Sequence, residues 1–231
     1  MELEKLLIAI PSYGGAVKVQ CVESLLKLQK LLSRRKIKRR FDFISYAEIA
    51  AVRNLFGTLM VEHPNASHLL FIDTDMRFAP ETVERLIEAR KRIIGCFYSQ
   101  RRDGGGVVGV VDTPTEVPVD GLIEATAIGM GLCLIEGGVF RELADKVSRQ
   151  ADHPFENRLR GPLLGFFNPP PSSDTYVSED IAFCRRWRQA GGQVHALVRE
   201  DIGHVGEKVY ERDREAGLIM PPPASADGAF I

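Results

Sequence analysis

The sequence predicts an α/β protein with a mainly parallel central sheet flanked by helices. Short apolar runs such as Leu6–Ile10 and His68–Ile72 have the continuous hydrophobicity of strands that are buried on both faces. Segments with apolar residues at three- and four-residue spacings separate these runs, as in amphipathic helices. Because strands that alternate with helices join through right-handed crossovers, parallel pairing is expected.

The first half of the chain alternates regularly. Strands are expected at 6–10, 41–46, 68–72 and 93–98. The first helix is indicated by Cys21, Leu25, Leu28 and Leu32, and a second is expected over 47–62. Pro80 opens a third helix in its first turn, where the missing N–H of proline costs nothing.

The second half is less regular. The segment 101–118 is rich in Gly, Asp, Thr and Pro and is expected to be a loop, with Gly104–Gly106 a candidate lid. A strand is expected at 129–135, a helix at 138–147, a helix at 178–190 closed by Gly191, and a last strand at 193–198. Asn168 and the three prolines after it argue against regular structure there, and the Pro169 region is a candidate lid or acceptor site. The domain is expected to span 1–218, followed by a tail over 219–231 without fixed structure.

Bulk composition narrows the class of protein. A chain of 231 residues suits one large domain. Its 30 basic residues nearly cancel its 31 acidic ones, so no nucleic-acid partner is expected. The four cysteines are scattered within apolar stretches, as in a reduced core. Without a signal peptide or an apolar run of roughly 18–20 residues, a cytoplasmic location is expected.

Asp73-Thr74-Asp75 carries the strongest functional signal. The motif directly follows the apolar run that ends at Ile72. In an open parallel sheet, ligands bind beyond the carboxyl ends of the strands. Two carboxylates at that place suit Mg²⁺ or Mn²⁺, which usually also binds substrate phosphate oxygens. The alternative is a solvated turn without function.

Three further sets of residues are candidates, each with an ordinary structural explanation. Glu179 and Asp180 follow Ser178 and can be first-turn acids after an N-cap, or one of them can be a general base. His204 is expected on a loop beyond the last strand, where it is a weak ligand candidate. Arg53 and Asn54 fall beside the apolar stripe of their helix, as exposed polar residues do.

The basic run Arg34–Arg40 is usually a solvated helix end. Alternatively, it makes a peripheral contact with anionic lipid or a lipid-linked acceptor, at roughly 1 kcal/mol per basic residue.

Taken in order, the motifs resemble GT-A fold glycosyltransferases, a Rossmann-like group, and family 2 in particular. The resemblance covers roughly residues 5–206. The matching segments are Ile8–Tyr13, Arg53-Asn54, Phe71–Asp75, Gly129–Gly131, and Ser178–Cys184 leading to Gly192.

The resemblance implies a role for each matched residue. Pro11, Ser12 and Tyr13 line the nucleotide base and ribose, and Arg53 faces the nucleotide or its diphosphate. Asn54 and Gly131 also belong to the substrate site. Asp73 approaches the ribose or the metal, while Asp75 and His204 hold the metal. Asp180, with Glu179 beside it, is the catalytic base of an inverting enzyme.

The implied reaction transfers a sugar from a nucleotide diphosphate sugar, UDP- or GDP-linked, to a hydroxyl acceptor with a divalent cation, Mn²⁺ or Mg²⁺. The acceptor is a glycan, a lipid-linked molecule or another hydroxyl compound. Since no tryptophan or basic motif of processive synthases follows the Ser178 helix, the enzyme is expected to be non-processive. A retaining mechanism stays open because retaining families share the Asp-x-Asp motif.

Three other classes compete with this interpretation. A HAD-type phosphatase has its Asp-x-Asp on the first strand, whereas here the motif follows the third. A nucleotidyltransferase has a basic, Gly-rich loop after the first strand, whereas Pro11–Gly15 contains no Arg or Lys. A nucleotide-sugar-binding protein without turnover is the non-enzymatic alternative.

Overall fold

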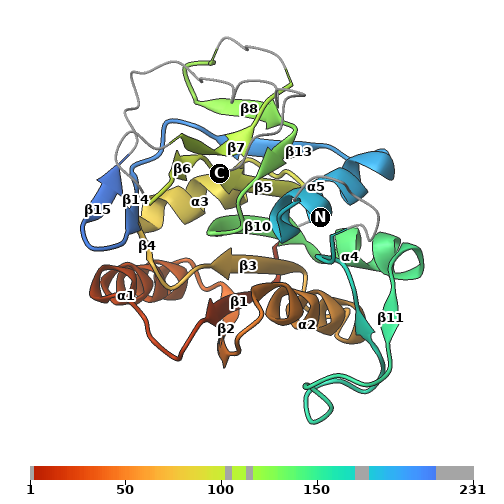
Figure 1. The fold of residues 1–231 in the computed structure, drawn as a ribbon. Coiled ribbons are helices and arrows are strands. Elements are labelled where there is room, and N and C mark those ends of the chain that lie inside the picture. Colours follow the sequence, from red (N-terminus) through yellow and green to blue (C-terminus); the bar gives the residue numbers. More distant parts are fainter. Residues whose placement is uncertain (1–2, 102–105, 113–116, 170–176, 212–231) are drawn as a thin grey trace, which may run out of the picture.

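A seven-stranded sheet forms the centre of the protein. The computed structural model describes residues 3–101, 106–112, 117–169 and 177–211. Figure 1 shows the sheet, whose strands lie in the order β2 (Lys38–Ser45), β1 (Lys5–Ser12), β3 (His68–Ile72), β10 (Leu132–Glu136), β5 (Ile93–Cys96), β13 (Val194–Leu197) and β8 (Leu122–Ala125).

Most strands of this sheet point the same way. β1 pairs in parallel with β2 and β3, and β5 with β13. β10 lies between β3 and β5 and is antiparallel to both, and β8 is antiparallel to β13. Strands β2, β1, β3, β5 and β13 therefore share one direction. This confirms the predicted mainly parallel sheet, with two reversed strands that hydrophobic periodicity cannot reveal because it carries no direction.

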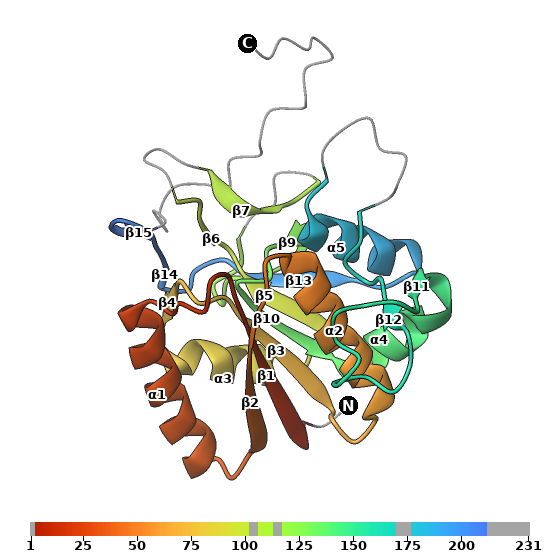
Figure 2. The same cartoon turned by 60° about the horizontal axis from the view of Figure 1, so that its bottom comes forward.

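Helices cover both faces of the sheet, as predicted. α1 (Val19–Arg34) and α3 (Pro80–Glu88) bury their apolar stripes on one face. α2 (Ile49–Glu62), α4 (Gly137–Leu143) and α5 (Glu179–Gln189) pack on the other. Figure 2 shows the two groups on either side of the strands. All four cysteines are buried and free, which agrees with the prediction of core thiols.

Short strands outside the central sheet correct several predictions. They are β4 (Met76–Phe78), β14 (Ile202–Val205) and β15 (Val209–Glu211); β6 (Tyr98–Ser99), β7 (Val107–Val110) and β9 (Ala127–Ile128); and β11 (Arg149–Gln150) with β12 (Leu163–Leu164).

The segment 193–198 is thus not the last strand, His204 lies in a strand rather than a loop, and β7 interrupts the predicted loop 101–118. Runs of two to four residues are too short to show a periodicity, so the sequence could not reveal them.

The helix boundaries follow local chemistry. Pro80 stands in the first turn of α3, as predicted. Gly191 closes α5 with a φ of 88°, a left-handed conformation that glycine adopts without strain. α4 stops at Leu143, and a short 3₁₀ turn, Ala144–Lys146, covers the rest of the helix expected over 138–147.

The expected tail at 219–231 lies outside the described residues, as does most of Gly104–Gly106. In the part of the chain that the structure describes, no helix is both long and apolar enough to cross a bilayer.

Candidate active site

Separate segments of the chain bring the candidate residues to one edge of the sheet. β1 and β3 end there with Ser12 and Ile72, so Asp73 begins where β3 stops. α2 precedes β3 and α5 precedes β13, and each helix runs opposite to the strand that follows it. The first turns of both helices therefore lie at the edge where β1 and β3 end. Side chains that are more than a hundred residues apart in sequence therefore come into contact.

Arg53 is the centre of this constellation. It lies on α2 with a side chain that is only 4% exposed. Its Nη2 donates to both carboxylate oxygens of Asp73 at 3.0 Å, and its Nη1 donates to Glu179 Oε1 at 2.6 Å. Burial lowers the pKa of Arg53, but the charges of Asp73, Glu179 and Asp180 outweigh burial and raise it above its ordinary value. The interpretation of Arg53 as an exposed helix residue is therefore wrong.

Asn54 is also buried and not exposed, but it faces a different segment. Its Oδ1 accepts the N–H of Phe167 at 2.7 Å, and its Nδ2 donates to Asn168 Oδ1 at 2.7 Å. Arg186 of α5 donates to the carbonyl oxygens of Phe166 and Asn168. These bonds fix the segment just before Pro169 against α2 and α5.

Asp75 faces His204 and Arg101. Its Oδ2 lies 3.4 Å from His204 Nε2 and 3.1 Å from Arg101 Nη1. Burial raises the pKa of Asp75, but the hydrogen bond from His204 and the positive charges of His204 and Arg101 together lower it below its ordinary value. The main chain supports this geometry, because Val205 N–H donates to the Asp75 carbonyl at 2.7 Å.

His204 has the hydrogen-bonding pattern of a metal ligand. Its Nδ1 lies 2.9 Å from the carbonyl oxygen of Ser99, which can only accept, so Nδ1 carries the proton. Without a metal, Nε2 contacts Asp75 through a second proton, as in an ion pair. When that proton is lost, Nε2 presents a lone pair, and a cation between it and the Asp75 carboxylate satisfies both groups. Mg²⁺ and Mn²⁺ commonly take one or two protein ligands and complete their shell with water and substrate phosphates. The pair therefore fits such an ion, although no cluster of three or more His, Cys, Asp or Glu ligands occurs among the described residues.

Tyr98 belongs to the site but was not identified from the sequence. Its hydroxyl accepts the N–H of Gly131 at 3.1 Å, and its ring meets His204 edge-on with centroids 5.3 Å apart. Burial and the charges of Asp73 and Asp180 raise its pKa well above the ordinary value. The only signal in the sequence was its position at the end of the fourth predicted strand.

Gly131 is packed tightly at this edge. A Cβ on Gly131 would lie 2.7 Å from the Tyr98 hydroxyl, so a side chain does not fit. The Gly131 carbonyl accepts the N–H of Asp73 at 2.9 Å. Gly131 thus joins Tyr98 to the Asp73 end of β3 through its backbone.

The end of β1 places three residues beside the site in different ways. Pro11 and Ser12 are buried, and the Ser12 hydroxyl donates to the Ala16 carbonyl at 3.1 Å. Tyr13 is 80% exposed. Its ring is therefore free to stack on a planar ligand.

Asp180 lies in the first turn of α5, next to Glu179. Its Oδ1 accepts the N–H of Ile181 at 2.8 Å and a hydrogen bond from the Ser178 hydroxyl. Ser178 occupies the N-cap position, but its side chain bonds to Asp180 instead of capping the helix. Glu179 is engaged by Arg53, whereas no ion pair to Asp180 is formed within the described part of the chain.

Comparison with known proteins identifies the fold. No protein-family model and no curated protein matches the sequence. Among solved structures, the chain is similar to A197 from STIV, with 16% identity, a TM-score of 0.53, and coverage of 95% of this chain and 100% of that one.

It is also similar to a mutant of a Drosophila β-1,4-galactosyltransferase 7 in complex with manganese, UDP-Gal and xylobiose, with 12% identity, a TM-score of 0.50, and coverage of 93% and 83%. A third similar structure is GalNAc-T7 with UDP, GalNAc and Mn²⁺, with 13% identity, a TM-score of 0.50, and coverage of 98% of this chain and 46% of that one. The chain thus spans about half the length of GalNAc-T7, and it has the GT-A fold of these glycosyltransferases.

Proposed function

We propose that this protein transfers a sugar from a nucleotide diphosphate sugar to a hydroxyl acceptor, with a divalent cation and inversion at the anomeric carbon. The observation that carries the proposal is Arg53, which ties Asp73, at the end of β3, to Glu179, at the start of α5. The two acidic motifs thereby share one edge of a GT-A sheet, where α/β proteins bind their ligands.

The donor side of the site uses residues at the ends of β1 and β3. Tyr13 stacks on the base, and Pro11 and Ser12 shape the pocket for base and ribose. Asp73 approaches the ribose, with its carboxylate oriented by Arg53. UDP is the first nucleotide to test, because UDP or UDP-Gal is bound in two of the similar structures. GDP stays the alternative.

Asp75 and His204 hold the cation in this proposal. Arg101 already contacts Asp75 Oδ2, which marks this carboxylate as a position that attracts positive charge. When bound, Mn²⁺ or Mg²⁺ neutralises the charge that develops on the departing diphosphate.

Asp180 is the proposed base, in preference to Glu179. A general base must accept a proton from the acceptor hydroxyl within hydrogen-bond reach. Glu179 already forms an ion pair with Arg53, with 2.6 Å between Oε1 and Nη1. We therefore assign Glu179 the role of positioning Arg53. Asp180 has a second carboxylate oxygen beyond the one that Ser178 and Ile181 occupy.

The test of this proposal is release of UDP from UDP-Gal and UDP-GalNAc with Mn²⁺, with water or an added glycan as acceptor. We expect Asp180→Asn to retain UDP binding and to lose turnover by about 10² to 10⁴, the usual contribution of a positioned base. Glu179→Gln is the matched control and should keep more activity. Turnover by Asp180→Asn at the wild-type rate would refute the assignment of the base. UDP binding without turnover by any form would instead indicate a binding protein.

A further inference from the structure

The end of the basic run, from Lys38 to Arg40, lines a cavity at the end of the sheet opposite the candidate active site. The cavity has a volume of about 540 Å³ and is lined by Lys5, Lys38, Arg40, Asp42, His63 and Arg158, among others. Lys5 and Lys38 are the first residues of β1 and β2, whereas the candidate active site lies beyond Ser12. Seven residues of β-strand separate these ends by about 23 Å, so the cavity is distinct from the donor site.

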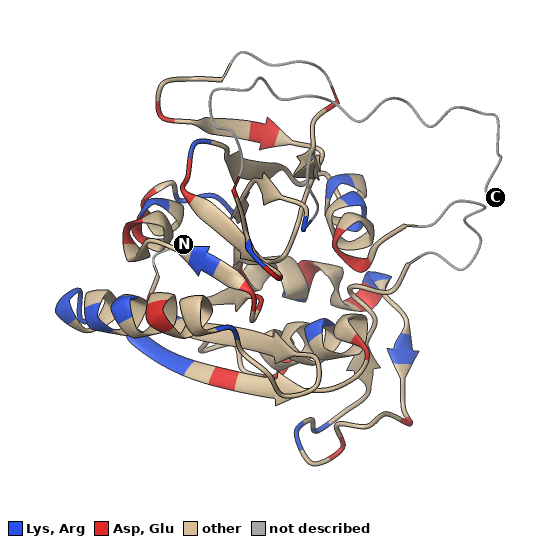
Figure 3. Ribbon diagram, turned by 60° about the vertical axis from the view of Figure 1, so that its left-hand side comes forward, with Lys and Arg blue, Asp and Glu red and all other residues tan. Residues whose placement is uncertain are grey.

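Strand alternation directs alternate residues of the run into this cavity. Successive side chains of β2 point to opposite faces, so Lys38, Arg40 and Asp42 share one face. Arg39 also borders the cavity, but its side chain points to the other face and donates to Gln29 Oε1 of α1 at 3.0 Å. Figure 3 shows basic residues at the end of α1 and the start of β2, with an acidic residue farther along β2. The run is therefore more than a solvated helix end.

A single buried carboxylate serves two arginines of this cavity. Asp42, which is 8% exposed in its side chain, accepts from Arg158 and lies 3.4 Å from Arg40 Nη2. Lys5 and Lys38 form no ion pair with any described residue. One negative charge thus faces four cationic side chains, and Asp42 pre-orients two guanidinium groups. Arginines held in this way suit the paired oxygens of a phosphate.

Apart from Arg39 and Asn157, the rest of the lining is apolar. Leu7 of β1, Leu59 of α2 and Ala66 contribute to the wall. A volume of about 540 Å³ falls within the range of small-molecule sites, which combine an apolar wall with a few convergent polar groups. The ligand that matches this lining carries a phosphate group and an apolar portion.

We propose that this cavity binds a phosphate-bearing amphipathic molecule, with Arg40, Arg158, Lys38 and Lys5 around the phosphate and Leu7 and Leu59 against the apolar part. The phosphate belongs either to a lipid headgroup or to a soluble phosphorylated molecule, since both present the same chemistry to the cavity. The site is independent of the proposed sugar transfer.

The test uses inorganic phosphate as the probe and backbone amide NMR as the readout. We expect phosphate to shift the amides of residues 38–42 and 157–158. The variant Lys38→Gln/Arg40→Gln should bind phosphate roughly tenfold or more weakly, because it removes two charged donors. Arg40 is 73% exposed, and Asp42 keeps Arg158 as its partner, so this variant retains the fold.

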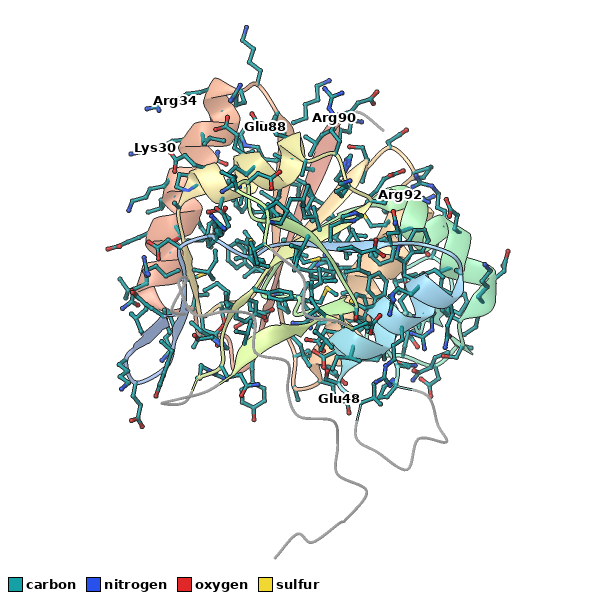
Figure 4. All side chains as sticks on the ribbon, turned by 90° about the horizontal axis from the view of Figure 1, so that it is seen from above. Lys30, Arg34, Glu48, Glu88, Arg90 and Arg92 are labelled. Carbon is teal, nitrogen blue, oxygen red and sulfur yellow. The ribbon has the colours of Figure 1, made fainter. Side chains whose placement is uncertain are left out.

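The matched control is Lys30→Gln/Arg34→Gln, which removes the same charge from α1. Figure 4 shows both side chains pointing outward from that helix. This control should bind phosphate like the wild type. No shift at the cavity amides, or an equal loss in both variants, would overturn the proposal.

A vesicle experiment separates the two sources of phosphate. Vesicles of phosphatidylcholine with phosphatidic acid are compared with vesicles of phosphatidylcholine alone. Competition between phosphatidic acid vesicles and phosphate for the cavity amides supports a lipid headgroup as ligand. Phosphate binding without such competition supports a soluble phosphorylated molecule.

Discussion

Arg53 joins the two acidic motifs of the candidate site through one side chain. It is a buried guanidinium that is paired with Asp73 and Glu179, both of which keep partial access to water. The sequence put Arg53 beside the apolar stripe of its helix, so periodicity alone favoured an exposed residue. Only the resemblance to glycosyltransferases singled it out. Its contacts involve residues 20 and 126 positions away, and such pairings are not visible in local sequence.

Replacing Arg53 with methionine should lower the free energy of unfolding by about 3 kcal/mol, because it leaves two partly buried carboxylates without their cation. Urea unfolding at pH 7 measures the change. Arg188→Met is the control, since Arg188 pairs with the exposed Asp112 and should cost less than about 1 kcal/mol. Equal stability of the two variants would show that the Arg53 pairs are energetically minor.

His68 gives a pH dependence of stability. Burial lowers its pKa below 6.5, although the charge of Glu136 opposes the shift. His68 therefore takes up a proton at a higher pH in the unfolded chain than in the folded protein. The contribution of neutral His68 to stability is fully present above pH 6.5 and is lost as the pH falls below that value. His195 shifts in the same direction through burial.

We expect His68→Gln to reduce the loss of stability between pH 7 and pH 5. Urea midpoints measured across this range for the wild type and the variant provide the test. Identical slopes would mean that His68 does not titrate differently in the folded and unfolded states.

At the scale of elements, the long helices and the buried strands were predictable, and the short strands were not. β3 and β1 are apolar enough to be recognised as strands from the sequence. The apolar stripe from Cys21 to Leu32 likewise predicts the helix α1. β14, by contrast, holds His204 beside β4 through pairings across more than a hundred residues. A strand of four residues with one glycine carries no local signal of that pairing, so the sequence placed His204 on a loop.

α2 also shows packing that overrides helix propensity. Gly57 lies in the helix interior, and a Cβ there would come within 2.7 Å of the Phe166 ring and 3.0 Å of Phe140. Propensity alone predicts that Gly57→Ala stabilises the protein by about 1 kcal/mol. Overpacking against the two rings should reverse the sign and destabilise the protein by about 1–3 kcal/mol.

Thermal unfolding of Gly57→Ala tests this sign. Gly161→Ala is the control, because its Cβ would meet nothing closer than 3.8 Å and should change stability by less than about 0.5 kcal/mol. A Gly57→Ala variant that is more stable than the wild type would contradict the packing argument.

At the scale of the whole molecule, the fold class followed from the sequence, because alternating strands and helices constrain topology strongly. The reversed strands β10 and β8 were not predictable, since direction depends on long-range connection. Of the candidate site, the motifs Asp73-Thr-Asp75 and Ser178-Glu-Asp180 were found from residue type and position at element ends. Tyr98 and Arg101 were missed, because their proximity to His204 and Asp75 arises only when β6 and β14 come together.

The central claim is that this edge of the sheet binds a nucleotide through a divalent cation at Asp75. The most direct measurement is a thermal-shift panel of UDP, GDP, CDP and dTDP, each with and without Mn²⁺, on the wild type and Asp75→Ala. At a concentration of about 100 times its Kd, one nucleotide should raise the free energy of unfolding of the wild type by roughly 2.7 kcal/mol, and its Tm by about 5 to 10 °C. This shift should occur only when Mn²⁺ is present. The absence of a shift with every nucleotide, or the same shift in Asp75→Ala, would contradict the account.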